Sequence, residues 1–247
     1  MPVIGQFFDW PTITRALPRL LAEGLRNTLL VAFLAIIVGL MIGVLMAALL
    51  LSKRWWVRLP AQAYVGVLRS LPVVLVVMLI GVGLPAAGLR PFGREAFGYA
   101  VLAIGVVSGA YVADIVRSGI LSVEPSQVHA ARMDGGTPLQ AMWLVVVPQA
   151  VQRCLPALAG QFVRDVKESS LVYVLGLGIG QRELFFIAQE EAARTNNASP
   201  LVAAGACYLA ITLPLTFLVA RATRRRDSRA SRLPAYRPIS MRLGAYR

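Results

Sequence analysis

Four charged residues interrupt an otherwise apolar segment in the second half of the chain, and they are the first candidates for chemistry. They are Arg164, Asp165, Lys167 and Glu168, and their apolar flanks of about ten and about twelve residues are each too short to cross a bilayer. Charges inside a membrane span cannot face lipid, so these residues pair with one another or line a wet cavity. Arg164 and Glu168 are four residues apart and can form an ion pair on one helix face. Two interpretations stay open: a self-neutralising pair that fixes helix packing, and the border of a path for a polar solute.

The sequence offers few residues that could carry out covalent chemistry. The chain has one histidine, His129, and no nucleophile–base pair stands out, so neither acid–base catalysis nor metal binding is expected. The Gly-x-x-x-x-Gly-Lys-Ser/Thr sequence of a P-loop does not occur, so we expect no nucleotide binding of that kind. Cys154 and Cys207 lie in apolar runs, which favours free thiols packed among helices. We predict a transport role, with no catalytic residue, no metal and no cofactor.

A polar stretch with its own turn, residues 128–149, lies between long apolar runs. Its front, residues 129–133, is rich in alanine and predicts a short helix. Asp134, Gly135 and Gly136 should end that helix, because glycine reaches positive φ at little cost. We call this stretch the polar hairpin.

The second half of the polar hairpin carries the signals of a new helix start. The hydroxyl of Thr137 can cap free backbone N–H groups, Pro138 suits the first helical position, and Gln140 stands where a capping-box partner would. A plain connector between membrane spans needs neither caps nor paired glycines. The pattern therefore predicts a loop built for docking, the alternative being a helical hairpin with no partner.

The polar hairpin resembles the cytoplasmic Glu-Ala-Ala loop of ABC importer permeases, in its polar amino acid uptake version. Ala130, Ala131, Gly135 and Pro148 fit that pattern, whereas His129 stands where the family usually has Glu. In the family this loop is the coupling helix, which sits in a groove of the ATPase subunit. The residues that the resemblance implies for coupling to an ATPase are His129, Ala130, Ala131, Arg132, Asp134, Gly135 and Gly136.

Three shorter motifs support the resemblance. Residues 69–72, Arg-Ser-Leu-Pro, are similar to the family's Arg-Gly-Thr-Pro element, the alternative being a simple Pro kink. Residues 108–111, Ser-Gly-Ala-Tyr, with Asp114 and Arg117 resemble its Ser-Gly-Ala-Tyr-x-x-Glu-x-x-Arg ending, and we expect these two charges to form a structural pair. Residues 167–171 look like its Lys-Asp-Thr-Ser-Leu. The candidates for lining a translocation path are Arg69, Arg164, Lys167, Glu168 and Ser169.

Apolar blocks must position these residues. The chain has 247 residues and is 57% hydrophobic, above the ~45–50% of soluble domains. Two glycine pairs at i, i+4 spacing, Gly39 with Gly43 and Gly105 with Gly109, should let helices approach closely. The fold class expected is all-α: a polytopic membrane helical domain of about five transmembrane helices with a cytoplasmic coupling-helix loop. The predicted spans are residues 28–51, 62–84, 96–119, 151–180 and 201–220.

The basic C-terminal end predicts how the chain is oriented. Nine arginines and one acid from Arg221 onward supply +8 of the formal net charge of +13. A basic tail directly after a span is typical of a cytoplasmic end that faces anionic lipid, and it argues against nucleic acid as a partner. With five spans the N-terminus then lies outside, although Arg15, Arg19 and Arg26 on that side oppose the usual charge bias.

These expectations divide the chain into three parts. An N-terminal extracytoplasmic or interfacial segment, with a short interfacial helix, covers residues 1–26. An importer-type transmembrane domain covers residues 27–220, with the coupling loop at 122–150, and a basic cytoplasmic tail covers residues 221–247. Residues 181–200 are polar and should lie outside the cell.

The resemblance implies a permease subunit of a binding-protein-dependent ABC importer in the inner (plasma) membrane, for a polar or charged amino acid or a related small organic ion. It also implies ATP-binding cassette ATPase subunits, where ATP is hydrolysed, a second permease subunit, identical or paralogous, an extracytoplasmic solute-binding protein, and lipid. A stand-alone secondary transporter or channel would explain the intramembrane charges equally well but would leave the capped loop without a purpose. A membrane-anchored regulator would leave four further spans unexplained.

Overall fold

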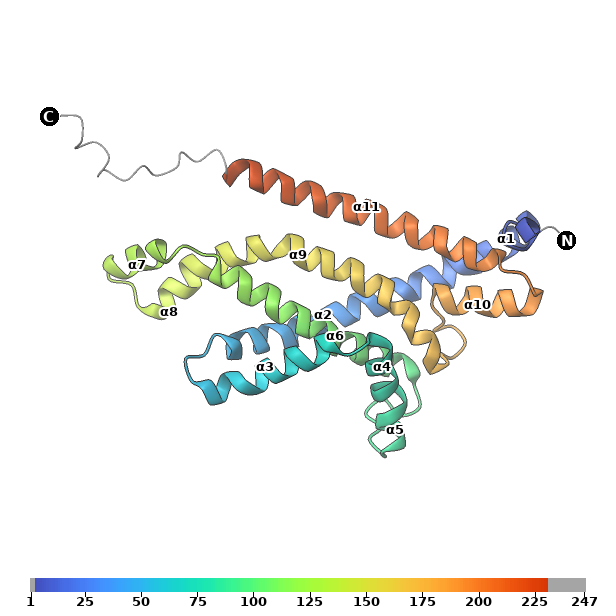
Figure 1. The fold of residues 1–247 in the computed structure, drawn as a ribbon, viewed down its shortest axis with the longest axis horizontal. Helices are drawn as coiled ribbons and strands as arrows, with labels where there is room; N and C mark the ends of the chain where they lie inside the picture. The colour runs from blue at the N-terminus through green and yellow to red at the C-terminus, as the bar shows by residue number, and fades with distance from the viewer. Residues whose placement is uncertain (1–2, 231–247) are drawn as a thin grey trace.

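The computed structural model describes residues 3–230, and this part of the chain is built from helices and turns without a strand (Figure 1). Four long helical segments run along the length of the molecule, with the chain's N-terminal end at one extreme and the polar hairpin at the other. Within residues 3–230, four helical segments are long and apolar enough to cross a membrane, and a bent pair of helices makes five if it counts as one span. The predicted all-α class and the prediction of about five spans are confirmed.

The first span is longer than expected. A single-turn 3-10 helix, η1 (Val3–Gln6), precedes α1 (Trp10–Arg19), which continues through a π-helical turn, η2 (Leu20–Gly24), into α2 (Leu25–Leu50). The resulting candidate span of 41 residues extends over about 61 Å, more than the ~40–45 Å of a whole bilayer. The helix predicted for the N-terminal segment therefore exists, but it is continuous with the first span.

α2 and α6 (Ala96–Leu121) form the central pair of the fold. Glycines of α2 meet small or branched residues of α6: Gly39 packs against Ser108, and a Cβ on Gly43 would lie only 2.5 Å from Cγ1 of Val112. Small residues, glycine above all, allow helices to approach this closely. The close approach predicted from the glycine pairs is confirmed, and we call this contact the glycine seam.

The second predicted span is not one straight helix. Its two halves are bent by 110° at a short break, so the span predicted over residues 62–84 is present as a bent pair of helices. Pro72 cannot donate a backbone hydrogen bond, and its ring pushes Leu71 into an extended conformation (φ −85°, ψ 143°) that ends the preceding helix. The pieces are α3 (Trp55–Ser70), α4 (Val73–Met78), the π-helical η3 (Leu79–Gly83) and α5 (Leu84–Ala86).

The polar hairpin runs directly into the fourth span. The candidate span begins at Pro138 and ends at Leu175, so the helix predicted from residue 151 in fact starts inside the hairpin. A 3-10 stretch replaces the regular helix directly after the charged segment. The elements are α7 (Pro125–Met133), α8 (Pro138–Ala141), the π-helical η4 (Met142–Val146), α9 (Val147–Glu168) and the 3-10 helix η5 (Ser169–Leu175).

Two helices complete the fold. α10 (Leu184–Thr195) lies in the polar region that was predicted to be outside, and α11 (Ser199–Ala230) contains the last predicted span. α11 continues through the first part of the predicted basic tail, and the rest of that tail, residues 231–247, lies outside the described residues. A buried cluster joins α1, η2, α10 and α11 at the N-terminal end of the molecule: Ile13, Ala16, Leu20, Leu184, Ile187, Ala188, Ala203, Ala204 and Cys207.

Candidate functional site

The turn of the polar hairpin depends on its two glycines. Gly135 has φ +88°, a conformation that side chains with a Cβ rarely adopt. At Gly136 an added Cβ would lie 2.6 Å from the carbonyl oxygen of Ala131. The helix α7 ends at Met133 as a result, which confirms the predicted break.

The second helix of the hairpin starts with the predicted capping box. The backbone N–H of Gln140 donates to Oγ1 of Thr137 (3.2 Å), and the backbone N–H of Thr137 donates to Oε1 of Gln140 (2.8 Å). Caps of this kind typically stabilise a helix start by ~1 kcal/mol. The turn therefore has one defined shape although it extends from the body of the protein.

The hairpin presents an exposed surface with apolar residues. Nothing in α7 is buried, and Met133 is 88% exposed. Leu139, Trp143 and Leu144 are also exposed. Contiguous exposed apolar side chains among polar ones are typical of a protein or membrane contact. Of the residues predicted for coupling, His129, Ala130, Arg132, Asp134 and Gly135 are exposed, and Ala131 and Gly136 are half-buried.

Side-chain contacts fix the hairpin to the ends of α6 and α9. Nε2 of Gln149 donates to Oε1 of Gln127 (2.6 Å), and Nη1 of Arg153 donates to the carbonyl oxygen and the hydroxyl of Ser122. A small buried cluster lies beneath these contacts, formed by Val123, Val146 and Ala150 with Ile120 and Val128. The base of the hairpin is therefore attached to both long helices.

The charged segment of α9 is arranged differently from the predicted ion pair. Arg164 does not pair with Glu168 but lies over the ring of Tyr111, 4.4 Å from its centre. Oε2 of Glu168 is buried, and it has no hydrogen-bond partner in the part of the chain that the structure describes. Asp165 is fully buried and accepts hydrogen bonds from Ser108 (2.9 Å) and Gln161 (2.8 Å). The predicted Arg164–Glu168 bridge is wrong, because an aromatic face on α6 is available to the guanidinium.

Arg69 joins the same cluster from the last turn of α3. Its guanidinium forms an ion pair with Asp114 and lies 5.4 Å from the centre of the Tyr111 ring. The predicted Asp114–Arg117 pair is therefore wrong: both charges share a helix face, but Arg69 of the neighbouring helix is the partner that Asp114 contacts. The fold thus brings Arg69 and Arg164, far apart in sequence, onto one tyrosine.

The two remaining candidates for lining a translocation path, Lys167 and Ser169, differ in their exposure. Lys167 is exposed, and it forms no ion pair among the described residues. Ser169 is fully buried, and its hydroxyl donates to the carbonyl oxygen of Val166 (2.8 Å), so it faces the protein interior in this structure.

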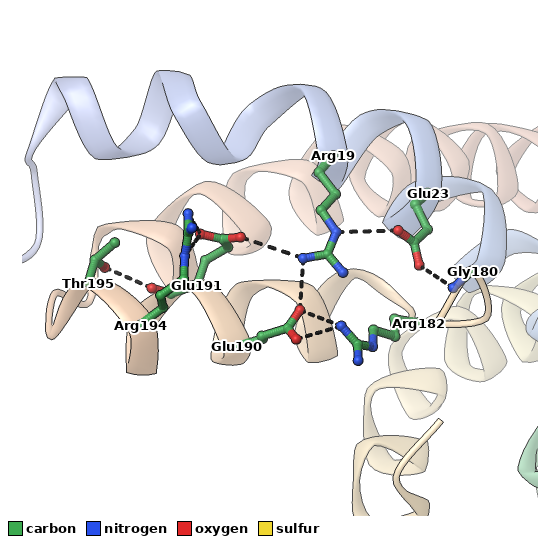
Figure 2. A network of polar contacts seen from close by, with 8 residues as sticks. All are labelled: Arg19, Glu23, Gly180, Arg182, Glu190, Glu191, Arg194 and Thr195. Atoms are coloured by element: carbon green, nitrogen blue, oxygen red, sulfur yellow. Dashed lines mark hydrogen bonds and ion pairs between the residues drawn. The ribbon is translucent and has the colours of Figure 1, made fainter. Parts of the chain in front are cut away.

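A polar network at the opposite end of the molecule was missed from the sequence (Figure 2). Arg19 donates to Glu23 (3.3 Å) and to Glu190 (2.8 Å), and Glu190 also accepts from Arg182. Burial disfavours the charged form of Glu190, but the bonds from Arg19 and the charges of both arginines outweigh it and lower the pKa of Glu190. In the sequence, only the i, i+4 spacing of Arg19 and Glu23 pointed to this network, and that spacing gives no indication that residues of α10 take part.

The glycine-containing loop before α10 is held by side chains of η2 and α2. Oε1 of Glu23 accepts from the backbone N–H of Gly180 (3.1 Å), and Nδ2 of Asn27 donates to the carbonyl oxygens of Gly180 (2.9 Å) and Arg182 (3.0 Å). Ile179 in this loop is 87% exposed. The network and the loop therefore lie together on the surface at the N-terminal end.

A buried carboxylate starts α10. Glu183 accepts from the backbone N–H groups of Phe185 (2.5 Å) and Phe186 (2.7 Å) and from the hydroxyl of Tyr208 on α11 (3.0 Å). Burial raises the pKa of Glu183 to about 7, although these three hydrogen bonds act in the opposite direction. Glu183 thereby fixes α10 to α11.

Comparisons with known proteins agree with this architecture. Residues 39–228 match the family model described as "Binding-protein-dependent transport system inner membrane component". The chain is 33% identical over 223 residues to the glutamate/aspartate import permease protein GltK of Escherichia coli O157:H7, covering 88% of this chain and 98% of the relative. It is 35% identical over 219 residues to the glutamine transport system permease protein GlnP of Escherichia coli K12, covering 88% and 97%. It is also 34% identical over 199 residues to the arginine transport system permease protein ArtQ of Bacillus subtilis 168, covering 79% and 87%.

Solved structures show the same fold. One chain from a crystal structure of an amino acid ABC transporter with histidines superimposes with a TM-score of 0.77 at 32% sequence identity, covering 88% of this chain and 99% of that one. A chain of the MetNI methionine ABC transporter in an inward-facing conformation superimposes with a TM-score of 0.69 at 20% identity, covering 85% and 97%, and supports the fold alone.

Proposed function

The chain belongs to the family of binding-protein-dependent transport system inner membrane components, and we propose that it carries a polar or charged amino acid, or a related small organic ion, as the permease subunit of an ATP-binding-cassette importer. It is a transport subunit and not an enzyme, and ATP hydrolysis belongs to a separate partner. The substrate class rests on the names of the relatives, which transport acidic, amide and basic amino acids.

The observation that carries the coupling role is the polar hairpin. Its turn is fixed by a capping box and two glycines, its tip is exposed, and its base is tied to α6 and α9. We propose that the ATPase subunit grips residues 129–136 and that closure of the ATPase dimer displaces the hairpin as a rigid unit. The displacement then tilts α6 and α9 between inward-open and outward-open states.

The proposed orientation puts the hairpin and the C-terminus in the cytoplasm and the N-terminus outside. The acidic partners of Arg19 support it, because Glu23, Glu190 and Glu191 neutralise a base that would otherwise oppose this topology. A second permease subunit completes the path, and the surface around α10 is where a solute-binding protein would deliver substrate.

The charged cluster around Tyr111 is the proposed border of the translocation path. Arg69 and Arg164 can attract a carboxylate, and Lys167, three residues after Arg164, is exposed. The unpartnered oxygen of Glu168 can accept a hydrogen bond from an ammonium group. Together these groups offer both charges of an amino acid a partner.

Cysteine crosslinking tests the coupling role. Ala130→Cys and Asp134→Cys place a thiol on exposed parts of the hairpin, while the native Cys154 and Cys207 are buried. In inner-membrane vesicles that contain the whole transporter, a short bifunctional crosslinker should join these variants to the ATPase subunit.

The control is Thr14→Cys on the exposed side of α1, at the other end of the molecule, which should give no such product. A hairpin that never crosslinks to the ATPase, or whose thiols react with an impermeant reagent from outside, would overturn the proposal.

A further inference from the structure

A groove between α2 and α9 lies near the N-terminal end of the first span. Leu29, Leu30 and Phe33 of α2 and Phe162 of α9 give it apolar walls, and Arg26 brings the one charged side chain to its lining. Its volume of about 410 Å³ lies in the range of pockets that bind small organic molecules (~300–1,000 Å³). Arg26 precedes Leu30 by one helical turn, so the charge lies at one end of the groove.

Arg26 lacks the partners that Arg19 has. No ion pair or side-chain hydrogen bond involves Arg26 among the described side chains, although it is exposed and only two turns from Arg19, which contacts three carboxylates. The uncharged apolar stretch of the first span begins directly after it, at residue 28. Arg26 therefore lies at the boundary between membrane and water, where phosphate groups of lipids are the abundant anions.

The groove continues an apolar stripe that runs down the exposed side of α2. Leu30, Phe33, Ile37, Met41 and Val44 are exposed and recur every three or four residues, so they share one face of the helix. An exposed apolar face along a membrane span is in contact with acyl chains or another span. A chain that enters the groove next to Arg26 can follow this stripe toward the middle of the bilayer.

We propose that this groove binds an anionic phospholipid. The phosphate pairs with the guanidinium of Arg26, which offers two parallel N–H donors, and one acyl chain lies between Phe33 and Phe162. In the proposed orientation the lipid belongs to the outer leaflet of the inner membrane. A polar amino acid does not fit the apolar walls, and a second copy of the chain would have to bring a carboxylate to Arg26.

Lipid retention measures this binding directly. The full-length chain is placed in nanodiscs with equal amounts of phosphatidylglycerol and phosphatidylcholine, transferred to mild detergent, and examined by native mass spectrometry. The wild type should retain phosphatidylglycerol, and Arg26→Gln should lower its retention about fivefold, the effect expected of one arginine near an anionic surface. Leu30→Trp, which fills the groove, should lower retention of both lipids.

Arg15→Gln is the matched control, because Arg15 is exposed on α1 and does not line the groove; it should retain as much lipid as the wild type. A photoactivatable phosphatidylglycerol should label the peptide that contains Phe33 in the wild type and lose most of that labelling in Arg26→Gln. Equal retention in Arg26→Gln and the wild type, equal retention of the two lipids by the wild type, or a dimer that replaces lipid in the groove would each overturn the proposal. These results do not depend on coupling to the ATPase, so they can fail or succeed independently of the transport role.

Discussion

Single residues at the N-terminal end of the molecule control how α10 is attached. Glu183 is the clearest case, because one buried carboxylate caps α10, contacts Tyr208 of α11 and lies next to the loop that Asn27 holds. The sequence offered Glu183 only as one acid in a polar stretch. Nothing local predicts burial of a carboxylate, since burial depends on Tyr208, which is 25 residues away.

The raised pKa of Glu183 predicts how the stability of the protein depends on pH. The folded protein keeps the proton up to about pH 7, whereas an unfolded chain releases it near the ordinary value of 4.5. The stabilisation is therefore complete below about pH 4.5 and is lost as the pH rises toward 7, by about 3 kcal/mol in total.

Glu183→Gln removes this titration and keeps an oxygen for the backbone N–H groups. The melting temperature of the wild type relative to Glu183→Gln, measured in detergent, should fall between pH 5 and pH 7.5 and then level off. A difference in melting temperature that stays constant over this range would contradict the prediction.

At the scale of elements, the glycine seam decides how α2 and α6 pack. Gly43→Ala should destabilise the protein by ~1–3 kcal/mol, because the new methyl group would meet Val112 and the backbone of Ala113. Gly66→Ala on α3 is the control: nothing lies within 4 Å of the added carbon, so it should be neutral or stabilising by up to ~1 kcal/mol. Thermal unfolding compares the two variants, and equal melting temperatures would contradict the prediction that the glycine seam decides how α2 and α6 pack.

The turn of the polar hairpin sets how well movement is transmitted. Gly135→Val should cost ~1–2 kcal/mol at φ +88° and deform the turn. Uptake should then fall by about tenfold while the basal ATPase activity of the complex persists. Gly135→Asn should behave almost like the wild type, because Asn tolerates positive φ. Normal uptake by Gly135→Val at normal membrane levels would count against a rigid hairpin.

Local signals predicted the elements that depend on their own sequence. The capping box of Thr137 and Gln140, the break at Gly135 and the glycine seam were all predicted, because each follows from side-chain or backbone properties within a few residues or from helix periodicity. The bend at Pro72 was noted only as an alternative, since proline within a span produces anything from a slight kink to a full break. α10 was missed, because its stability comes from packing on α1 and α11.

At the scale of the whole molecule, the fold class and family were predictable and the pairing of charges was not. Arg164 and Arg69 both meet at Tyr111, and Asp114 pairs with Arg69 and not with Arg117. Spacing along one helix shows which pairs are permitted, but neighbouring helices decide which pairs form. The network of Arg19 with Glu190 likewise joins residues that are 171 positions apart.

The glycine seam makes one stiff body of α2 and α6. Ser108 and Val112 of α6 lie so close to Gly39 and Gly43 that there is no room for a side chain at either glycine, and α2 is continuous with α1 through the π-helical turn η2. Rearrangement must then occur at the margins of this body: at the joint before Pro72 and in the 3-10 stretch after Glu168. The subunit thus consists of a stiff pair of helices, α2 and α6, and two flexible joints, before Pro72 and after Glu168, that border the charged cluster.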